Sequence, residues 1–406
     1  MFLLALFACT GAPDAPAAND PAYTTTHRVW SLVGDGLTED QGLVDLSVAG
    51  PLRGHVRVWV GDAATELVDG VGQLDLRDQP PGLVDLIWED GGGAFALTTV
   101  VRSAPLYVVP SVDWDSSDTR DNVMDWQFAL HQEHPELRIT HLVGPYLWTD
   151  PELTDDRKAK LTADLASYRD DHDDEIGLHI HPYCHLVELA GVPCATEPSL
   201  AGGVDPTGYA VPNWAYTEAQ FADIVATSGD LFEAHGFARP TSYRAGGWTA
   251  TTDILRALTS EGIVVDSSAN NWARMEEWQG TGILYDWNAE AWSTIGDTSQ
   301  PYWPQQGDAQ AGGPDPIGLL EVPDNAILAD YVTEDEMIDV FDQNWPGGPL
   351  AVPTQVSMGW HDSVNAVFRA RVSRALDRFD GGLAARDSGP VVYATMTELV
   401  DVDWPE

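Results

Sequence analysis

Three histidines stand close together in the segment EIGLHIHPYCH, residues 175–185. His179 and His181 share one face if the segment is a strand, whereas His181 and His185 have the i, i+4 spacing of a helical turn. One carboxylate with two imidazoles can hold a metal ion and leave a coordination position open for water. The segment therefore predicts a metal site that uses either His179 with His181 or His181 with His185. A histidine standing alone is more often structural.

Two carboxylates, Asp113 and Asp115, follow the apolar stretch LYVVPSV. Being separated by one residue, they share a face of a strand, and carboxylates this close repel each other unless a cation, a proton or an arginine lies nearby. We expect one of them to bind the metal and the other to act as a general base. A solvated acidic turn is the alternative, because the chain is rich in aspartate.

Three further segments bring polar residues to the ends of apolar stretches: SYRAGGW with Arg244, IVVDSSA with Asp266 and SMGWHD with His361. Arg244 carries a permanent charge and, near Asp113, would hold that carboxylate in place. His361 is a candidate general acid, with Asp266 as the carboxylate that orients it. A surface salt bridge for Arg244 and a buried structural role for His361 are the alternatives.

Glycines and aromatic residues beside these positions are candidates for substrate binding. Gly246 and Gly247 allow a tight turn and leave space for a ligand. The chain has 16 tryptophans, and an aromatic ring packs well on the apolar face of a pyranose. We therefore include Trp114, Tyr183 and Trp248 among the substrate-binding candidates, with a place in the core as the alternative for tryptophan.

The elements that must position these residues alternate between strand and helix throughout residues 105–406. Strand-like segments such as EIGLHIHP are separated by helix-like segments such as DDRKAKLTADLASYRDDHD. This order is typical of parallel β/α units, in which functional residues gather at the carboxyl ends of the strands. We predict a β/α barrel, complete or incomplete.

Residues 27–104 follow a different pattern. HVRVWVGD, GLVDLIWED and AFALTTVVRS alternate apolar and polar residues and are broken by Gly, Asp and Pro. We predict a small all-β, sandwich-like domain that acts as a spacer or binds a partner or a glycan.

The start of the chain suggests export. Residues 1–9, MFLLALFAC, resemble a bacterial lipoprotein signal that ends at a lipidated cysteine, here Cys9. Residues 10–26 are rich in Pro and Ala and are typical of a flexible tether. We expect a protein of the cell envelope with a lipid anchor in a bacterial membrane; a cytoplasmic protein with an apolar start is the alternative. In an oxidising compartment Cys184 and Cys194 can form a disulfide, with free thiols or metal ligation as alternatives.

Composition excludes some partners. The chain has 64 acidic and 20 basic residues and a formal net charge of −44, so it would repel nucleic acid and anionic lipid. No later segment is long and apolar enough to cross a bilayer. We expect no nucleic-acid partner and no membrane contact except through the anchor.

Five segments, in this order, resemble the metal-dependent polysaccharide deacetylases, carbohydrate esterase family four: SVDWD, EIGLHIHPYCH, SYRAGGW, IVVDSSA and SMGWH. The resemblance covers about residues 105–400. It implies a distorted (β/α) barrel of fewer than eight complete units, here preceded by the small β domain. It also implies a divalent metal, with zinc the expected ion, and a polysaccharide or other glycan substrate that loses N-acetyl groups.

By position, the resemblance assigns Asp113 as the catalytic base and Asp115 as a metal ligand. Arg244 would tether the base, and His361 would protonate the departing amine with Asp266 behind it.

The histidine segment departs from the family pattern. His179 matches the first family histidine, but the second lies four positions later, where this chain has Tyr183. The pair of ligands therefore stays open between His179 with His181 and His181 with His185. The departures indicate an outlying branch. An inactive glycan-binding relative, or a metal-dependent hydrolase of esters or other amides, is the alternative function.

Overall fold

The computed structural model describes residues 11–405. The expected signal, residues 1–9 with the lipidation site Cys9, lies outside the described residues. The chain divides into two compact units. Unit 1 is made of the residues up to Pro105 with Gly348–Pro353 and Gly382–Pro390, and unit 2 of Leu106–Gly347, Thr354–Gly381 and the residues from Val391 onward.

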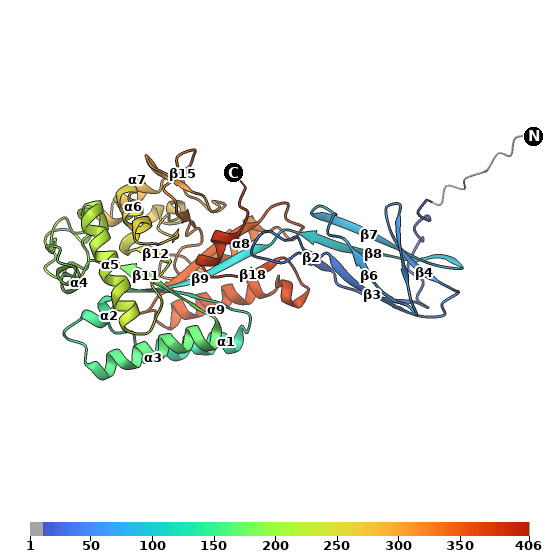
Figure 1. Ribbon diagram of the computed structural model, residues 1–406, viewed down its shortest axis with the longest axis horizontal. Coiled ribbons are helices and arrows are strands. Elements are labelled where there is room, and N and C mark those ends of the chain that lie inside the picture. Colours follow the sequence, from blue (N-terminus) through green and yellow to red (C-terminus); the bar gives the residue numbers. More distant parts are fainter. Residues whose placement is uncertain (1–10, 406) are drawn as a thin grey trace, which may run out of the picture. The chain divides into compact units, whose positions relative to one another are not determined.

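Unit 1 consists of two sheets packed face to face (Figure 1). Their strand orders are β1-β3-β6 and β2-β8-β7-β4-β5. The strands are β1 (Thr24–His27), β2 (Trp30–Leu32), β3 (Leu43–Ala49), β4 (Val56–Val60), β5 (Ala63–Leu67), β6 (Val71–Asp75), β7 (Gly82–Asp90) and β8 (Gly93–Ser103). Each sheet turns alternate residues inward, so that Leu46 of β3 packs in one core with Leu86 and Trp88 of β7. The small all-β, sandwich-like domain that the sequence predicts is present.

Unit 2 is built on a parallel sheet, which within the described residues has eight strands. Its order is β16-β13-β12-β11-β10-β9-β17, and β18 also pairs with β9. The strands are β9 (Leu106–Trp114), β10 (Thr140–Val143), β11 (Glu175–Ile180), β12 (Ser242–Ala245), β13 (Val265–Asp266), β16 (Leu320–Glu321), β17 (Thr354–His361) and β18 (Val391–Tyr393). A separate antiparallel pair is formed by β14 (Pro304–Gln305) and β15 (Asp308–Gly312).

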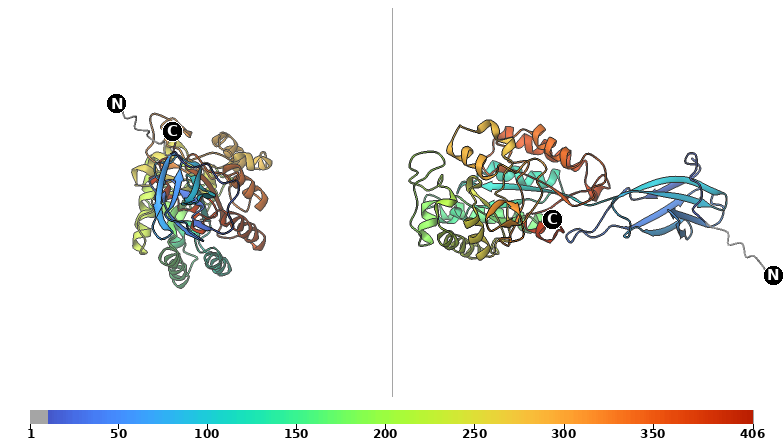
Figure 2. Two further views of the ribbon diagram at one scale, coloured as in Figure 1. Left: turned by 90° about the vertical axis from the view of Figure 1, so that its right-hand side faces the viewer. Right: turned by 90° about the horizontal axis from the view of Figure 1, so that it is seen from above.

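Helices lie on both sides of these strands in the right-hand view of Figure 2. They are α1 (Asp121–Glu133), α2 (Tyr146–Thr149), α3 (Asp155–His172), α4 (Cys184–Leu189), α5 (Glu218–Ala234), α6 (Thr252–Ser260), α7 (Ile283–Ala291), α8 (Glu334–Asn344) and α9 (Ala366–Asp380). Because helices cover the sheet, its central strands are apolar on both faces. All nine residues of β9, for example, are buried.

The barrel is distorted where β16 and β17 should meet. Between them runs an irregular segment, residues 324–329, that bonds to both sides: Asp324 N–H donates to the carbonyl of Ala269, and Ala329 N–H donates to that of Gly359. The segment therefore takes the place of a regular strand. The prediction of a distorted (β/α) barrel of fewer than eight complete units is confirmed. Among residues 11–405, no helix is long and apolar enough to cross a membrane.

Candidate active site

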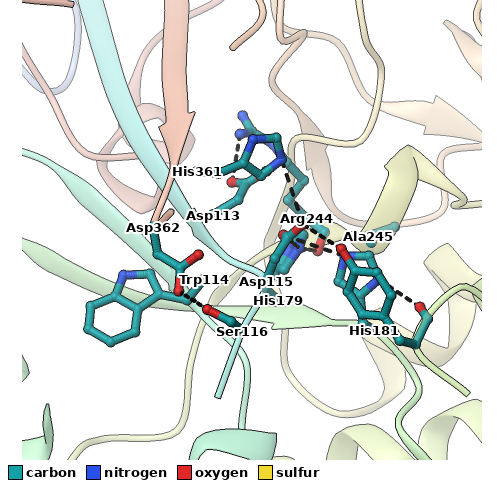
Figure 3. A network of polar contacts seen from close by, with 12 residues as sticks. Asp113, Trp114, Asp115, Ser116, His179, His181, Arg244, Ala245, His361 and Asp362 are labelled. Carbon is teal, nitrogen blue, oxygen red and sulfur yellow. Dashed lines mark hydrogen bonds and ion pairs between the residues drawn. The ribbon is translucent and has the colours of Figure 1, made fainter. Parts of the chain in front are cut away.

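The end of β9 carries the two carboxylates. Asp113 and Asp115 both line a cavity at the carboxyl ends of the strands. Trp114, between them, points away from this cluster (Figure 3) and packs edge-on against His141. Its expected role in substrate binding is wrong, because alternate residues of a strand face opposite sides.

Asp115 meets two histidines from the end of β11. Its Oδ1 lies 3.0 Å from Nε2 of His179 and 3.4 Å from Nε2 of His181. The hydroxyl of Tyr209 donates to the other carboxylate oxygen at 3.0 Å. One possible ligand atom from each of Asp115, His179 and His181 lies within 4.8 Å of the other two. Among the two pairs that the sequence left open, the structure brings His179 and His181 to the carboxylate.

The hydrogen bonds of the two rings fix which nitrogens face Asp115. Nδ1 of His179 lies 2.8 Å from the carbonyl oxygen of Arg244, and Nδ1 of His181 lies 2.9 Å from that of Tyr209. A carbonyl only accepts, so each Nδ1 carries a proton and, in a neutral ring, each Nε2 is an acceptor. Three acceptors then face one another, and a cation between them would relieve that conflict.

His185 lies apart from this cluster. Its Nδ1 is 2.7 Å from the hydroxyl of Thr149. His185 does not belong to the group in which ligand atoms of Asp115, His179 and His181 lie close together. His185 lies in the first turn of α4. Tyr183, which precedes this helix, packs against His185, Tyr146 and Tyr209, of which Tyr209 lines the cavity. The expectation that His185 is a metal ligand is therefore wrong, because the chain turns into a helix shortly after β11. A role of Tyr183 in substrate binding stays a prediction.

Arg244 lies under Asp113 and is fully buried. Its Nη1 donates to Oδ1 of Asp113 at 2.9 Å and to the hydroxyl of Ser111 at 3.0 Å, while Nε and Nη2 donate to Ser267. Asp324 is 3.6 Å from Nη2. The guanidinium thus holds Asp113 in a fixed orientation, as the sequence predicts for a tether.

His361, at the end of β17, is paired with a carboxylate other than the expected one. Its Nδ1 lies 3.0 Å from Oδ2 of Asp330, and its Nε2 lies 3.7 Å from Oδ2 of Asp115. Asp266 instead accepts from the hydroxyl of Ser268 and pairs with Glu321 on the neighbouring strand. The expected role of Asp266 behind His361 is wrong; Asp330 fills it, because the segment that replaces a strand ends beside β17.

These contacts shift two ionisation equilibria. Burial disfavours the charged form of His361, but Asp115 and the hydrogen bond to Asp330 outweigh it and raise the pKa of the imidazole to about 10. Burial likewise opposes the carboxylate form of Asp115, and the charge of His361 nevertheless holds its pKa well below the usual value. His361 is therefore protonated near neutral pH and can act as an acid.

The cavity above these side chains has a volume of about 350 Å³. Gly247 and Trp248 line it, as expected. Gly246 has a different role. A Cβ on it would lie 2.8 Å from the ring of His181, so a glycine here leaves room for this imidazole, a candidate metal ligand. Its expected contact with substrate is replaced by a contact with His181.

Sequence patterns miss several residues of the site. Tyr209 lies in the long segment between α4 and α5, and Asp330 and Tyr331 follow the irregular segment 324–329. None of them belongs to a periodic strand or helix whose pattern could have indicated its direction. Only the arrangement of distant segments brings them to the cavity.

A disulfide joins Cys184 and Cys194. The prediction of this pairing is confirmed, and metal ligation by either cysteine is excluded. The bond ties the start of α4 to the segment that continues to Leu200 and Tyr209, both of which line the cavity.

Comparison with known proteins gives distant likenesses. No family model matches the sequence, and no curated protein matches it. Among solved structures, the chain is similar to a protein described as a polysaccharide deacetylase from Mycobacterium smegmatis, with 15% identity, a TM-score of 0.42 and coverage of 73% of this chain and 89% of that one. It is also similar to a family 4 carbohydrate esterase from Streptomyces lividans, with 9% identity, a TM-score of 0.37 and coverage of 74% and 98%.

A third likeness is to a mutant of a carbohydrate esterase family 4 pseudoenzyme, with 9% identity, a TM-score of 0.36 and coverage of 79% and 87%. These proteins belong to the family that the five sequence segments resemble. With such low identities and TM-scores, none of them carries an argument about activity or substrate. The side chains of the cavity have to supply that argument.

Proposed function

We propose that this protein is a metal-dependent hydrolase that removes an N-acyl group, of which acetyl is the smallest common one, from an amino sugar of a glycan. The observation that supports it most is the convergence of three kinds of group on one cavity. They are a tethered carboxylate (Asp113), a three-acceptor cluster around Asp115 and a protonated imidazole (His361).

Asp115, His179 and His181 would hold the divalent ion, for which we propose zinc. One carboxylate and two imidazoles are ligands that zinc accepts, and they leave positions open. When bound, such an ion polarises a carbonyl and lowers the pKa of a water molecule beside it. Tyr209, which donates to Asp115, and the two backbone carbonyls that accept from the histidines keep the three ligands oriented.

The other side chains move protons. Asp113, held by Arg244, accepts a proton from the water that attacks the acyl carbon. The C–N bond then breaks, and His361, oriented by Asp330, donates its proton to the leaving nitrogen. The products are a carboxylate and an amine. In the course of the reaction Asp113 thus takes up one proton and His361 gives one up.

The experiment that tests this proposal measures amine release from N-acetylated and longer N-acylated glucosamine oligomers by the purified protein. We expect turnover with zinc, loss of turnover after chelation and recovery when zinc is restored. Asp113→Asn should lower kcat by a factor of about 100 or more while metal content is unchanged. Binding of the oligomers without any turnover would instead indicate a glycan-binding relative.

Metal content provides an independent check on the ligands. We expect bound zinc, measured by elemental analysis, to fall from about one equivalent to near zero in His179→Ala and His181→Ala. His185→Ala is the matched control, because this histidine bonds to Thr149 instead, and it should retain the metal. Loss of zinc from His185→Ala with retention in His179→Ala would contradict this set of ligands.

We also propose export to an oxidising compartment. The disulfide between Cys184 and Cys194 supports it, since such bonds persist outside the reducing cytosol. Lipid anchoring at Cys9 stays a prediction.

A further inference from the structure

Asp115, the carboxylate of the three-residue cluster, lies just beyond the regular part of its strand. β9 ends at Trp114, which pairs with Val143 across the sheet, and residues 115–120 then form an irregular turn that leads to α1. The hydrogen bonds of the sheet therefore no longer hold the backbone at Asp115. A metal ligand has to be kept within about 0.5 Å of its productive position, so other contacts must fix this turn.

Two hydroxyl groups of the turn converge on one carboxylate. Ser116 Oγ and Thr119 Oγ1 each donate to Oδ2 of Asp362 at 2.7 Å, and the first of these bonds is drawn in Figure 3. Thr119 and Asp362 are buried, and hydrogen bonds away from water are stronger. Because Ser116 directly follows Asp115, a bond to its side chain restrains the backbone that carries the candidate ligand.

Other bonds of the turn are less sheltered from water. Ser117 donates to Asp150, and Arg157 donates to the carbonyl of Thr119. Asp150 and Arg157 are half-buried, whereas Asp362 is fully buried. Among these partners, Asp362 therefore offers the turn its most rigid point of attachment.

Asp362 also lies where the strand of the candidate base meets that of the candidate acid. It follows His361 at the end of β17, and its backbone N–H donates to the carbonyl of Asp113 at 2.9 Å. The side chain of Asp362 thus connects the turn after β9 to the part of the sheet that carries both of these residues.

One oxygen of Asp362 adds nothing to the stability of the fold. Oδ1 is buried without a donor among the described residues, and a buried polar atom without a partner opposes folding. The contribution of the side chain therefore lies in the two hydroxyl bonds at Oδ2, which act on the turn after Asp115.

We propose that Asp362 is a positioning residue, which holds the carboxylate of Asp115 in place for a divalent cation by fixing the turn that follows it. The inference rests on the metal site of the proposed function, but it concerns binding of the ion and not the hydrolysis. Replacing residues that orient the ligands of a metal commonly weakens its binding about 10- to 100-fold. Loss of the bonds at Oδ2 should weaken the binding of zinc by a factor in this range.

The test measures the Kd of zinc by competition with a chromogenic chelator at one pH. We expect Asp362→Ala to raise the Kd about 10- to 100-fold. Asp362→Asn should keep most of the wild-type affinity, because its amide oxygen can still accept both bonds. Ser116→Ala and Thr119→Val each remove one hydroxyl and should raise the Kd by a smaller factor. Added to Asp362→Ala, they should have no further effect, since their common partner is already gone.

The matched control is Asp174→Ala. Oδ2 of Asp174 likewise accepts two side-chain bonds, from Nε2 of His131 at 2.9 Å and from Nε2 of His141 at 3.0 Å, and the residue is also buried. It precedes β11, at the opposite end of that strand from the candidate ligand His179. Its replacement should lower the stability of the fold and leave the Kd of zinc unchanged.

A wild-type Kd in folded Asp362→Ala protein would overturn the inference. So would an Asp362→Asn protein as weak as Asp362→Ala, because the charge and not the two bonds would then be responsible. If Asp362→Ala does not fold, an unchanged Kd in the double variant of Ser116→Ala with Thr119→Val would overturn it instead.

The proposed function can fail separately. The expected changes in Kd, without amine release from any N-acylated oligomer, would support the role of Asp362 and defeat the hydrolase alone. Amine release by the wild type, together with an unchanged Kd in Asp362→Ala, would defeat this inference alone. Wild-type protein that binds no zinc would overturn both.

Discussion

Nδ1 of His361 lies 3.0 Å from Oδ2 of Asp330. Asp330 belongs to neither a strand nor a helix, yet its position beside β17 lets it orient the imidazole whose Nε2 faces the cavity. A carboxylate in this position fixes the tautomer of the ring and favours its protonated form. The carboxylate that orients the candidate acid His361 therefore directly follows the irregular segment that replaces a regular strand of the barrel.

Replacing Asp330 with asparagine should lower kcat by a factor of about 100 to 10,000, because the orientation and charge of the acid both change. Loss of one anionic partner also lowers the pKa of His361 from its value of about 10. The acid must be protonated, so the alkaline limb of the pH–rate profile should move to lower pH. Steady-state kinetics over the pH range measure both effects.

The control for this variant is Asp266→Asn. Asp266 pairs with Glu321 and contacts Ser268, so its replacement should leave the alkaline limb in place even if it reduces stability. A shift of that limb in Asp266→Asn, with none in Asp330→Asn, would restore the pairing that the sequence suggested.

Local patterns sufficed to predict which carboxylates and histidines could form the site, although they left the pair of histidines open. Asp113 and Asp115, like His179 and His181, stand two residues apart at the ends of apolar strands, and this spacing alone places each pair on one face. The order of strands and helices predicted the barrel for a similar reason, since parallel strands bring their carboxyl ends to one edge. These features depend on residues that are neighbours in the sequence.

Asp330 and the leucines of the cavity could not be predicted in this way. The chain has 64 acidic residues, and nothing in the sequence around Asp330 distinguishes it from the others. Leu200 lies in an irregular segment and Leu284 at the start of α7, and both approach Gly247 from segments far away in the sequence. His185 was misjudged for a related reason: the i, i+4 spacing from His181 crosses the boundary between β11 and α4.

Arg244 should be among the residues on which the stability of unit 2 depends most. Arg244→Met would leave Asp113 and Asp324 buried without their counter-ion, at a cost of about 3–5 kcal/mol in the free energy of unfolding. Arg244→Lys should cost less, because it keeps the charge while losing most of the four hydrogen bonds. Denaturant unfolding followed by tryptophan fluorescence gives these values.

The matched control is Arg374→Met. Arg374 pairs with Glu334 at the surface, its side chain being 53% exposed, and exposed ion pairs contribute about 0–1 kcal/mol. If Arg244→Met unfolded at the same denaturant concentration as Arg374→Met, the buried guanidinium would not be the counter-ion of the two carboxylates.

Glu321 and Asp266 form a buried acidic pair on adjacent strands. Glu321 Oε2 and Asp266 Oδ2 are both buried without a donor among the described residues, an arrangement that a shared proton satisfies. Burial raises the pKa of Asp266 to about 6 and that of Glu321 well above its usual value. In the unfolded chain both carboxyls ionise near pH 4. Above that pH the folded protein therefore binds more protons than the unfolded chain, because Asp266 keeps its proton up to about pH 6 and Glu321 keeps its own to higher pH.

The free energy of unfolding should therefore fall as the pH rises above about 4.5 and should continue to fall above pH 6, where Glu321 still holds its proton, with each extra bound proton contributing about 1.4 kcal/mol per pH unit. In Glu321→Gln the amide donates to Asp266 without needing a proton, so the decrease should be shallower by that amount. Unfolding curves at several pH values measure the difference in slope between the two proteins. The exposed Glu152→Gln is the control and should follow the wild type; parallel curves for all three proteins would show that no proton is shared between Glu321 and Asp266.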